Sequence, residues 1–289
     1  MADGLIDSHV HLLLNEVEYP WMVDDVTQSL KGHDLLELEA EFSLHEVRGG
    51  VVVQAIGDAR ETATLLELTA RTPNLLGVVG WLDLSSPSVD EELNALALGQ
   101  YGEWLVGLRH QTHDESDANW LTRTDVLRGL EKVAALGLPF DLLIRTREIT
   151  AACSVAATFP DLKLVVDHLA KPPVNGVGIE AWDAGLASLA SFSNTYCKLS
   201  GLVTEVAPLG AWSSESLAPM LQRALNYFGP DRCLFGSDWP VCRLAATYTE
   251  VVELALRALK SLTSAEKHAV LRLNAIRLYD LDFPPRVCV

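Results

Sequence analysis

The chain opens with Leu5-Ile6-Asp7-Ser8-His9-Val10-His11-Leu12, a short apolar run that predicts a β-strand. Side chains alternate between the two faces of a strand, so His9 and His11 are expected on one face, with Asp7 below them. Neutral imidazole is the commonest protein ligand for zinc-like metals, so this pair predicts a metal or catalytic site. The alternative is a pair of ordinary strand histidines bonded to neighbouring groups.

Seven more apolar runs follow, with helical patterns between them. Strands are expected at 5–12, 50–55, 75–82, 105–111, 139–145, 162–169, 195–202 and 233–239. Helices are expected at about 35–47, 60–71, 89–97, 124–136, 148–158, 182–192, 214–228, 247–259 and 264–279, with an irregular segment at 14–34. Eight βα units of this size predict an α/β fold, a single (β/α)8 TIM barrel formed by one domain spanning 1–289. A doubly wound sheet is the alternative, but no Gly-x-Gly-x-x-Gly turn follows the first strand.

Composition narrows the classes of partner. The 289 residues carry 39 acidic and 22 basic side chains, a formal net charge of −17, which disfavours nucleic acid and anionic membranes. The five cysteines are scattered and show no Cys-x-x-Cys spacing, so neither a disulfide framework nor a thiolate zinc site is expected. No signal-peptide pattern and no membrane-spanning run is apparent. We therefore expect a cytoplasmic protein that acts on a small molecule.

In a barrel of this kind the chemistry comes from the C-terminal ends of the strands. Five of the eight histidines fall at or just past predicted strand ends: His9, His11, His110, His113 and His168. Asp238 ends the last strand, which lies beside the first strand in a closed barrel. It is predicted to be a metal ligand and the base that takes a proton from water. The alternative is that Asp238 caps the helix that follows.

The sixth strand ends in His168, which is predicted to be a third ligand or a donor that polarises a substrate oxygen. Asp167 alternates to the other face and is expected to be structural. Lys171 is expected either to meet a substrate oxyanion or to be solvated.

The fourth and fifth strands end in further candidates. Arg109 and His110 alternate, so only one of them can point into the barrel. Residues 113–117 are polar enough to form an exposed loop. Arg145 ends an apolar strand, where burial costs several kcal/mol unless the charge is paired, so it is expected to contact a carboxylate or a ligand oxygen.

Other catalytic motifs are absent from the sequence. It has no Gly-x-Ser-x-Gly elbow, no phosphate-binding P-loop and no His-Glu-x-x-His helix. No cysteine lies beside an evident histidine partner, which disfavours a cysteine nucleophile.

Three segments resemble the amidohydrolase superfamily, and within it the amidohydrolase-2 branch of TIM-barrel hydrolases: Ile6-Asp7-Ser8-His9-Val10-His11, Val166-Asp167-His168-Leu169-Ala170-Lys171-Pro172 and Phe235-Gly236-Ser237-Asp238-Trp239-Pro240. Three more are similar to the sugar-lactone hydrolases of that branch, of the L-rhamnonolactonase and L-fuconolactonase type: Gly107-Leu108-Arg109-His110, Phe140-Asp141-Leu142-Leu143-Ile144-Arg145 and Cys197-Lys198-Leu199-Ser200-Gly201-Leu202. The resemblance spans about 5–281, and its motifs are specific in combination and order.

This resemblance implies hydrolysis of a sugar (aldono) lactone, in which water attacks the ester carbonyl and the ring opens to a hydroxy acid. Asp238 would take the proton from water and return it to the leaving alkoxide. One divalent metal ion, zinc by preference, would be held by His9, His11, His168 and Asp238. In a metal-free mechanism the histidines would polarise the carbonyl themselves. The residues that would bind substrate oxygens are Arg109, His110, Arg145 and Lys171.

The sequence departs from parts of the superfamily pattern. Members with two metals carry a bridging lysine or glutamate on strand 4 and further histidines on strands 5 and 6, whereas strand 4 here offers His110 and strand 5 only Arg145. A binuclear centre is therefore not expected. The alternative function is that of a metal-dependent, non-oxidative decarboxylase of the same branch. Those enzymes commonly carry another histidine where this chain has Lys198 and Ser200. A third alternative is a non-catalytic barrel that binds a sugar acid.

Overall fold

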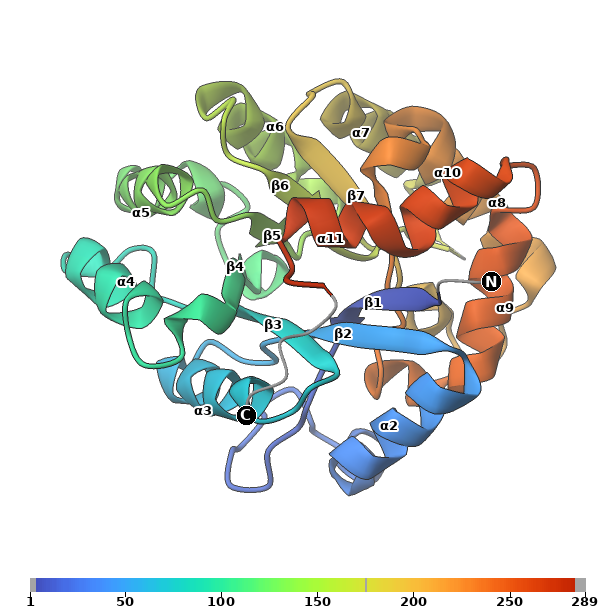
Figure 1. Cartoon of the computed structure of the whole chain (residues 1–289). Helices are drawn as coiled ribbons and strands as arrows, with labels where there is room; N and C mark the ends of the chain where they lie inside the picture. The colour runs from blue at the N-terminus through green and yellow to red at the C-terminus, as the bar shows by residue number, and fades with distance from the viewer. Residues whose placement is uncertain (1–3, 175, 284–289) are drawn as a thin grey trace.

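The computed structural model describes residues 4–174 and 176–283, and it confirms the predicted (β/α)8 barrel (Figure 1). Eight parallel strands pair in chain order: β1 (Leu5–Val10), β2 (Val47–Val53), β3 (Leu75–Gly80), β4 (Leu105–His110), β5 (Phe140–Leu142), β6 (Leu164–Val166), β7 (Thr195–Leu199) and β8 (Cys233–Phe235). A parallel backbone bridge between Val10 and Trp239 joins the first strand to the segment after the last, and so closes the sheet.

Helices follow the strands and surround the sheet: α2 (Leu35–Leu44), α3 (Ala59–Ala70), α4 (Val89–Ala97), α5 (Thr124–Ala135), α6 (Ile149–Thr158), α7 (Ile179–Ala190), α8 (Ser214–Phe228), α9 (Tyr248–Ala258), α10 (Ser264–His268) and α11 (Asn274–Leu278). A π-helical turn, Ala269–Leu273, joins the last two. The segment expected to be irregular contains a short helix, α1 (Asp25–Gln28), and a 3-10 turn. The other predicted helices are present at the predicted places.

Apolar side chains fill two regions of the barrel, and a smaller apolar cluster lies under the loop after β1. One lies between the sheet and the helices, where Trp182, Phe42 and Tyr248 are buried. The other lies inside the barrel, where Ile6 and other strand residues pack against Leu278 of α11 and against Tyr279. In Figure 1, α11 crosses one end of the barrel. That end is therefore closed by packing.

All eight strands end earlier than the apolar runs predict, and β5, β6, β7 and β8 do so by three or four residues. The run at 162–169 stops being a strand at Val166, because residues 168–171 adopt left-handed backbone conformations with φ of 51°, 55°, 57° and 47°. The run at 233–239 ends at Phe235, and Asp238 beyond it has a φ of 61°. In both places the chain leaves the sheet just where the candidate site residues begin.

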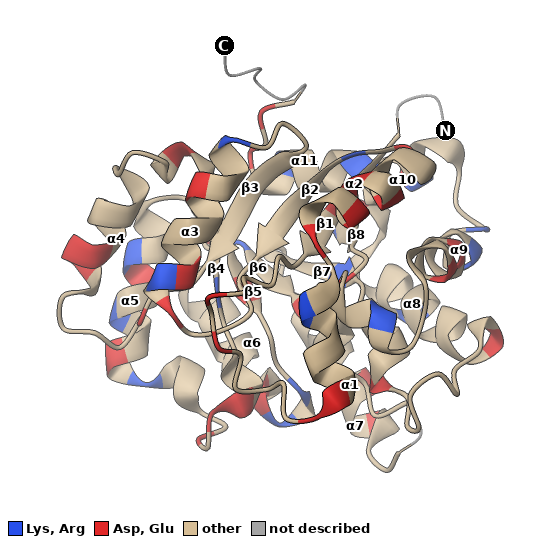
Figure 2. Ribbon diagram, turned by 90° about the horizontal axis from the view of Figure 1, so that it is seen from below, with Lys and Arg blue, Asp and Glu red and all other residues tan. Residues whose placement is uncertain are grey.

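The described part of the chain contains no helix that is both long and apolar enough to cross a membrane. Cys153, Cys197, Cys233 and Cys242 are free thiols, as expected, and Cys288 lies outside the described residues. Basic residues are dispersed over several helices and loops, as Figure 2 shows.

Candidate active site

A cavity of about 810 Å³ opens at the C-terminal ends of the strands. The loop after β1 contributes Pro20 and Trp21 to its wall, and the loop after β2 contributes residues 55–58. The candidates that reach the cavity surface are His11, Arg109, His110, His113, His168, Lys171 and Asp238. A volume of this size is typical of a site for a small molecule.

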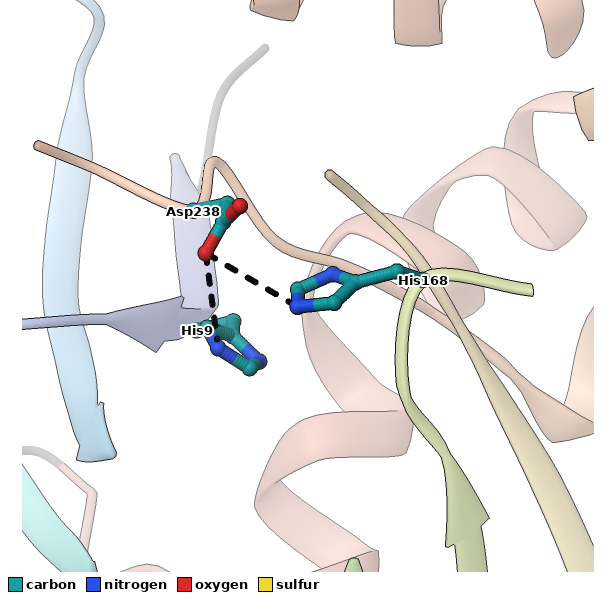
Figure 3. A group of neighbouring side chains, drawn as sticks. All are labelled: His9, His168 and Asp238. Atoms are coloured by element: carbon teal, nitrogen blue, oxygen red, sulfur yellow. Dashed lines mark ion pairs between the residues drawn. The ribbon is translucent and has the colours of Figure 1, made fainter. Parts of the chain in front are cut away.

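The structure brings His9, His11, His168 and Asp238 together at this end of the barrel. Asp238 Oδ1 lies 3.3 Å from His11 Nε2, 3.6 Å from His9 Nε2 and 3.8 Å from His168 Nε2. The Nε2 atoms of His9 and His11 are 3.2 Å apart. Figure 3 shows Asp238 between His9 and His168, with its carboxylate directed at both rings. All four side chains are buried.

The placement of Asp7 differs from the expectation that it shares a face with the two histidines. Its Oδ2 accepts a hydrogen bond from Tyr248 on α9, at 2.8 Å, in the layer between the sheet and the helices. The pairing of β1 with β2 is irregular between Asp7 and Val10. Such an irregularity re-aims side chains, so His9 faces the barrel interior while Asp7 does not.

Asp238 is held in place by the first strand. Its backbone N–H donates to His9 O at 2.9 Å, and its own carbonyl accepts from Cys242 N–H at 2.8 Å. The 3-10 turn Val241–Leu244 begins without a side-chain cap. The Asp238 carboxylate therefore faces the histidines, and the helix-cap alternative is wrong.

His168 and Lys171 lie at the two ends of the left-handed turn 168–171. The Trp182 indole N–H donates to Leu169 O at 2.7 Å inside this turn. His168 Nδ1 is hydrogen-bonded to Ser200 Oγ at 2.8 Å. At the neighbouring Gly201, a Cβ atom would lie 2.4 Å from His168 Nδ1, so only glycine leaves room for the ring.

The tautomer of His11 follows from its backbone contact. Its Nδ1 is 2.7 Å from Val53 O, and a carbonyl oxygen can only accept, so Nδ1 carries the proton. The lone pair on Nε2 therefore faces Asp238 and the cavity. His9 Nδ1 instead lies 3.2 Å from Lys198 Nζ and 3.5 Å from Asp167 Oδ1.

A layer of buried ions lies against His9 inside the barrel. Lys198 Nζ donates to Asp141 Oδ2 at 2.5 Å and lies 3.2 Å from Asp167 Oδ1. Arg109 donates to Asp167 Oδ2 at 3.1 Å and to Gln54 O, and its Nη1 lies 3.4 Å from His9 Nε2. Two cations thus balance two carboxylates, as burial of charge requires.

Lys198, Asp141 and Asp167 lie beside the site although the sequence pattern did not predict them there. Asp167 is buried inside the barrel in direct contact with His9, not on an opposite face away from it. A signal was present in the sequence: a lysine and an aspartate in the middle of apolar strands need partners, and both strands face the same interior.

The surroundings shift the pKa values of two imidazoles and of the Asp238 carboxylate, and these shifts set the charge of each group. Burial, followed by the charge of Lys198, holds the pKa of His9 well below its ordinary value, and burial does the same to the pKa of His168. Burial by itself would raise the pKa of Asp238, but His168 and His11 beside it outweigh that effect and lower the pKa. At neutral pH the site therefore has two neutral imidazoles facing an ionised carboxylate.

Four described atoms can surround one cation. His9, His168 and Asp238 each offer a ligand atom, all within 4.8 Å of one another, and His11 Nε2 lies beside them. In a tetrahedral zinc site with bonds of about 2.0–2.1 Å, neighbouring ligand atoms are separated by roughly 3.3 Å. The contacts of 3.2–3.8 Å around Asp238 and His9 are close to this value. The donor set and its spacing fit a single divalent ion.

The remaining candidates differ in their surroundings. Lys171 Nζ is 2.6 Å from Glu205 Oε1 and lines the cavity, whereas Arg145 pairs with Glu205 Oε2 at 2.9 Å behind it. The expectation that Arg145 pairs with a carboxylate is confirmed, but its side chain is 47% exposed, so it is not buried. Of Arg109 and His110, the former points into the barrel.

Both ring nitrogens of His110 are engaged within the protein. Nδ1 accepts from Trp81 Nε1–H at 3.0 Å, and Nε2 is 2.8 Å from Glu115 Oε1. Glu115 itself lines the cavity, although the sequence placed it in an exposed loop.

Comparison with known proteins agrees with this geometry. Residues 6–281 match the amidohydrolase family Amidohydro_2. An L-fucono-1,5-lactonase of Burkholderia multivorans is 34% identical over 96% of this chain and 97% of its own length. A crystal structure of an amidohydrolase from Burkholderia multivorans with bound zinc superimposes with a TM-score of 0.89, at 35% identity over 96% of this chain and 100% of that one. A 2,6-dihydroxybenzoate decarboxylase from Rhizobium, at 17% identity, TM-score 0.69 and coverage of 96% and 99%, shares the fold.

Proposed function

The chain belongs to the amidohydrolase family, and we propose that it hydrolyses a sugar (aldono) lactone to the open-chain hydroxy acid. The observation that carries this proposal is the ionised Asp238 carboxylate within 3.3–3.8 Å of three imidazoles at the floor of a cavity large enough for a sugar ring. The L-fucono-1,5-lactonase that matches nearly the whole chain supports the substrate class.

Asp238 is the general base in this mechanism. Its low pKa keeps the carboxylate ionised at neutral pH, ready to accept the proton of a water molecule that attacks the lactone carbonyl. The same group then delivers that proton to the ring oxygen as the carbon–oxygen bond breaks. The product is a hydroxyl group at one end of the chain and a carboxylic acid at the other, which releases its proton to solvent, and Asp238 is regenerated.

The negative charge that develops on the carbonyl oxygen needs a donor. Lys171 lines the cavity and spends one of its three N–H bonds on Glu205, so its ammonium can donate to that oxygen. The left-handed turn that carries Lys171 also carries His168, which fixes the two groups relative to each other. Arg145 and Glu205 complete the ionic support behind Lys171.

His9, His11, His168 and Asp238 would hold one divalent ion, with zinc favoured by the nitrogen-rich donor set and by the zinc in the related structure. Bound there, the ion would supply a Lewis acid beside the lactone carbonyl. The residues of the chain perform the remaining tasks. Asp238 moves the proton and Lys171 orients the carbonyl oxygen. The buried ions below His9 hold its imidazole ring in place.

Decarboxylase activity has no specific support from the site. The likeness to the decarboxylase is one of fold at 17% identity. Lys198 is buried with Asp141 below the site, and Ser200 is hydrogen-bonded to His168. Neither residue takes the place of the additional histidine of the decarboxylases.

The general-base role predicts that Asp238→Asn lowers kcat/KM for lactone hydrolysis by about 10²- to 10⁴-fold, because the amide cannot accept the proton. A pH indicator measures turnover, since ring opening releases acid. The control is Asp114→Asn, which removes another carboxylate of the cavity wall and should leave turnover within a few-fold of normal. Near-normal turnover in a folded Asp238→Asn protein would rule out this role.

The metal prediction is tested separately. Protein purified without a polyhistidine tag should contain about one equivalent of zinc, and chelation should lower both the zinc content and the turnover together. Readdition of zinc should restore both. Full activity in protein that elemental analysis shows to be free of metal would instead support polarisation by the histidines and Lys171 alone.

A further inference from the structure

One wall of the cavity contains an ordered chain of hydrogen bonds that the proposed mechanism does not use. Trp81 Nε1 lies 3.0 Å from His110 Nδ1, and His110 Nε2 lies 2.8 Å from Glu115 Oε1. All three residues line the cavity. The His110 ring stacks on Trp120, with centroids 3.9 Å apart and planes at 6°.

The direction of this chain is fixed by chemistry. An indole N–H can only donate, so His110 Nδ1 accepts and, in the neutral ring, Nε2 carries the proton. His110 is buried enough that its pKa is lowered, which keeps the ring neutral. Nε2–H therefore donates to Glu115 Oε1. His110 has no ring nitrogen left for a substrate and serves to position Glu115.

The loop that carries Glu115 is also tied down. The Arg147 guanidinium donates to the backbone carbonyl oxygens of His113 and Glu115, and Glu115 N–H donates to Thr112 O at 3.1 Å. The Glu115 side chain is 33% exposed. Within the described part of the chain, no residue donates a hydrogen bond to its Oε2. Glu115, which lines the cavity, thus keeps one carboxylate oxygen free of hydrogen bonds from these residues.

We infer that Glu115 is a specificity-determining residue, which accepts a hydrogen bond from a hydroxyl group of the substrate. The inference rests on the proposed lactonase activity and deepens it. The indole of Trp81, which lines the same cavity, offers apolar surface to the carbon skeleton of a sugar ring. The negative charge of Glu115 at the same place disfavours a substrate with a carboxylate there.

Glu115→Gln tests this inference sharply. His110 Nε2–H needs an acceptor, so the new amide turns its oxygen toward His110 and its NH2 group toward the cavity. The group that faces the substrate changes from an acceptor to a donor, while the shape of the side chain is kept. A hydrogen bond to a charged group contributes enough that its loss should cost about 10- to 100-fold in kcat/KM.

The measurement compares two lactones with each variant: L-fucono-1,5-lactone, which carries hydroxyl groups, and δ-valerolactone, which carries none. Glu115→Gln should lose 10- to 100-fold on the first and less than 3-fold on the second. The matched control is Asp58→Asn. Asp58 also lines the cavity, but both its oxygens are bonded to Arg60 and it caps α3, a task that asparagine also performs. This control should keep the selectivity of the unaltered enzyme.

An equal loss on both lactones, or no loss on either, would overturn the role of Glu115 while leaving the lactonase activity intact. If the unaltered enzyme hydrolysed neither lactone, the proposed function would fail, and the inference that rests on it would fail too.

Discussion

Five non-glycine residues near the reacting groups have positive φ angles between 47° and 61°: His168, Leu169, Ala170, Lys171 and Asp238. A left-handed conformation costs an L residue roughly 1–2 kcal/mol, so the surrounding structure must hold these residues in place. Trp182 does so by bonding Leu169 O, and β1 does so by bonding Asp238 N–H. These backbone conformations set the direction in which the imidazole of His168, the ammonium of Lys171 and the carboxylate of Asp238 point.

Gly201 shows how closely the backbone approaches these groups. A Cβ atom added at this position would lie 2.4 Å from Nδ1 and 2.5 Å from Cγ of His168. We expect Gly201→Ala to displace the His168 ring, to lower kcat/KM by at least 10-fold and to cost about 1–3 kcal/mol of stability. Steady-state kinetics and urea denaturation measure the two effects.

Gly137→Ala provides the control for this change. Gly137 has a φ of 72°, close to the 66° of Gly201, but an added Cβ would meet nothing within 4 Å. It should show the cost of a left-handed alanine, about 1 kcal/mol, with normal turnover. If both variants retained equal activity, the contact with His168 would have no catalytic importance.

Among the strands and helices, periodicity predicted each element but not every end. The amphipathic helix α8 has the predicted bounds, whereas valine-rich β2 overlaps the predicted run 50–55 but begins three residues earlier and ends two residues earlier. The ends of β6 and β8 were missed by three or four residues. Their left-handed turns follow from tertiary contacts, such as that of Trp182, which have no local signature.

In the candidate site, too, the features that follow from the sequence pattern were predicted, and those that depend on tertiary contacts were not. Counting strand ends placed His9, His168 and Asp238 together, because barrel topology alone brings those ends to one rim. The sequence did not predict that Glu115 lines the cavity, because the position of an acidic loop depends on which partner its side chain finds. His110 supplies that partner, and its own orientation depends on Trp81, 29 residues earlier in the chain.

Closure of the barrel joins the first strand to the segment after the last strand at the site. Asp7 Oδ1 accepts from the backbone N–H groups of His9 and Ser237, at 3.1 and 2.9 Å, and Oδ2 accepts from Tyr248. One buried carboxyl group thus links β1, the segment after β8 and α9. The position of Asp238 beside His9 therefore depends on the closed fold, so global unfolding and loss of the site should coincide.

Stability of the folded barrel should carry a pH dependence from Glu61, a fully buried residue of α3. Its Oε2 accepts from the N–H groups of Ala55 and Ile56, and Arg109 is the nearby cation, but burial dominates and raises the pKa of Glu61 to about 7. Below about pH 4.5 the group is protonated in both the folded and the unfolded state. Between about pH 4.5 and 7 the unfolded state loses this proton first, so the contribution of Glu61 to stability falls with rising pH and levels off above pH 7.

Glu61→Gln should remove this dependence, because glutamine stays neutral. The free energy of unfolding of the variant should rise relative to the unaltered protein by on the order of 2–3 kcal/mol between pH 4.5 and 8. Urea denaturation at several pH values measures the difference. Exposed Glu91→Gln removes the same formal charge from a chain of net charge −17 and should show no comparable trend. A difference that stays constant with pH would mean that Glu61 ionises equally easily in the folded and unfolded states.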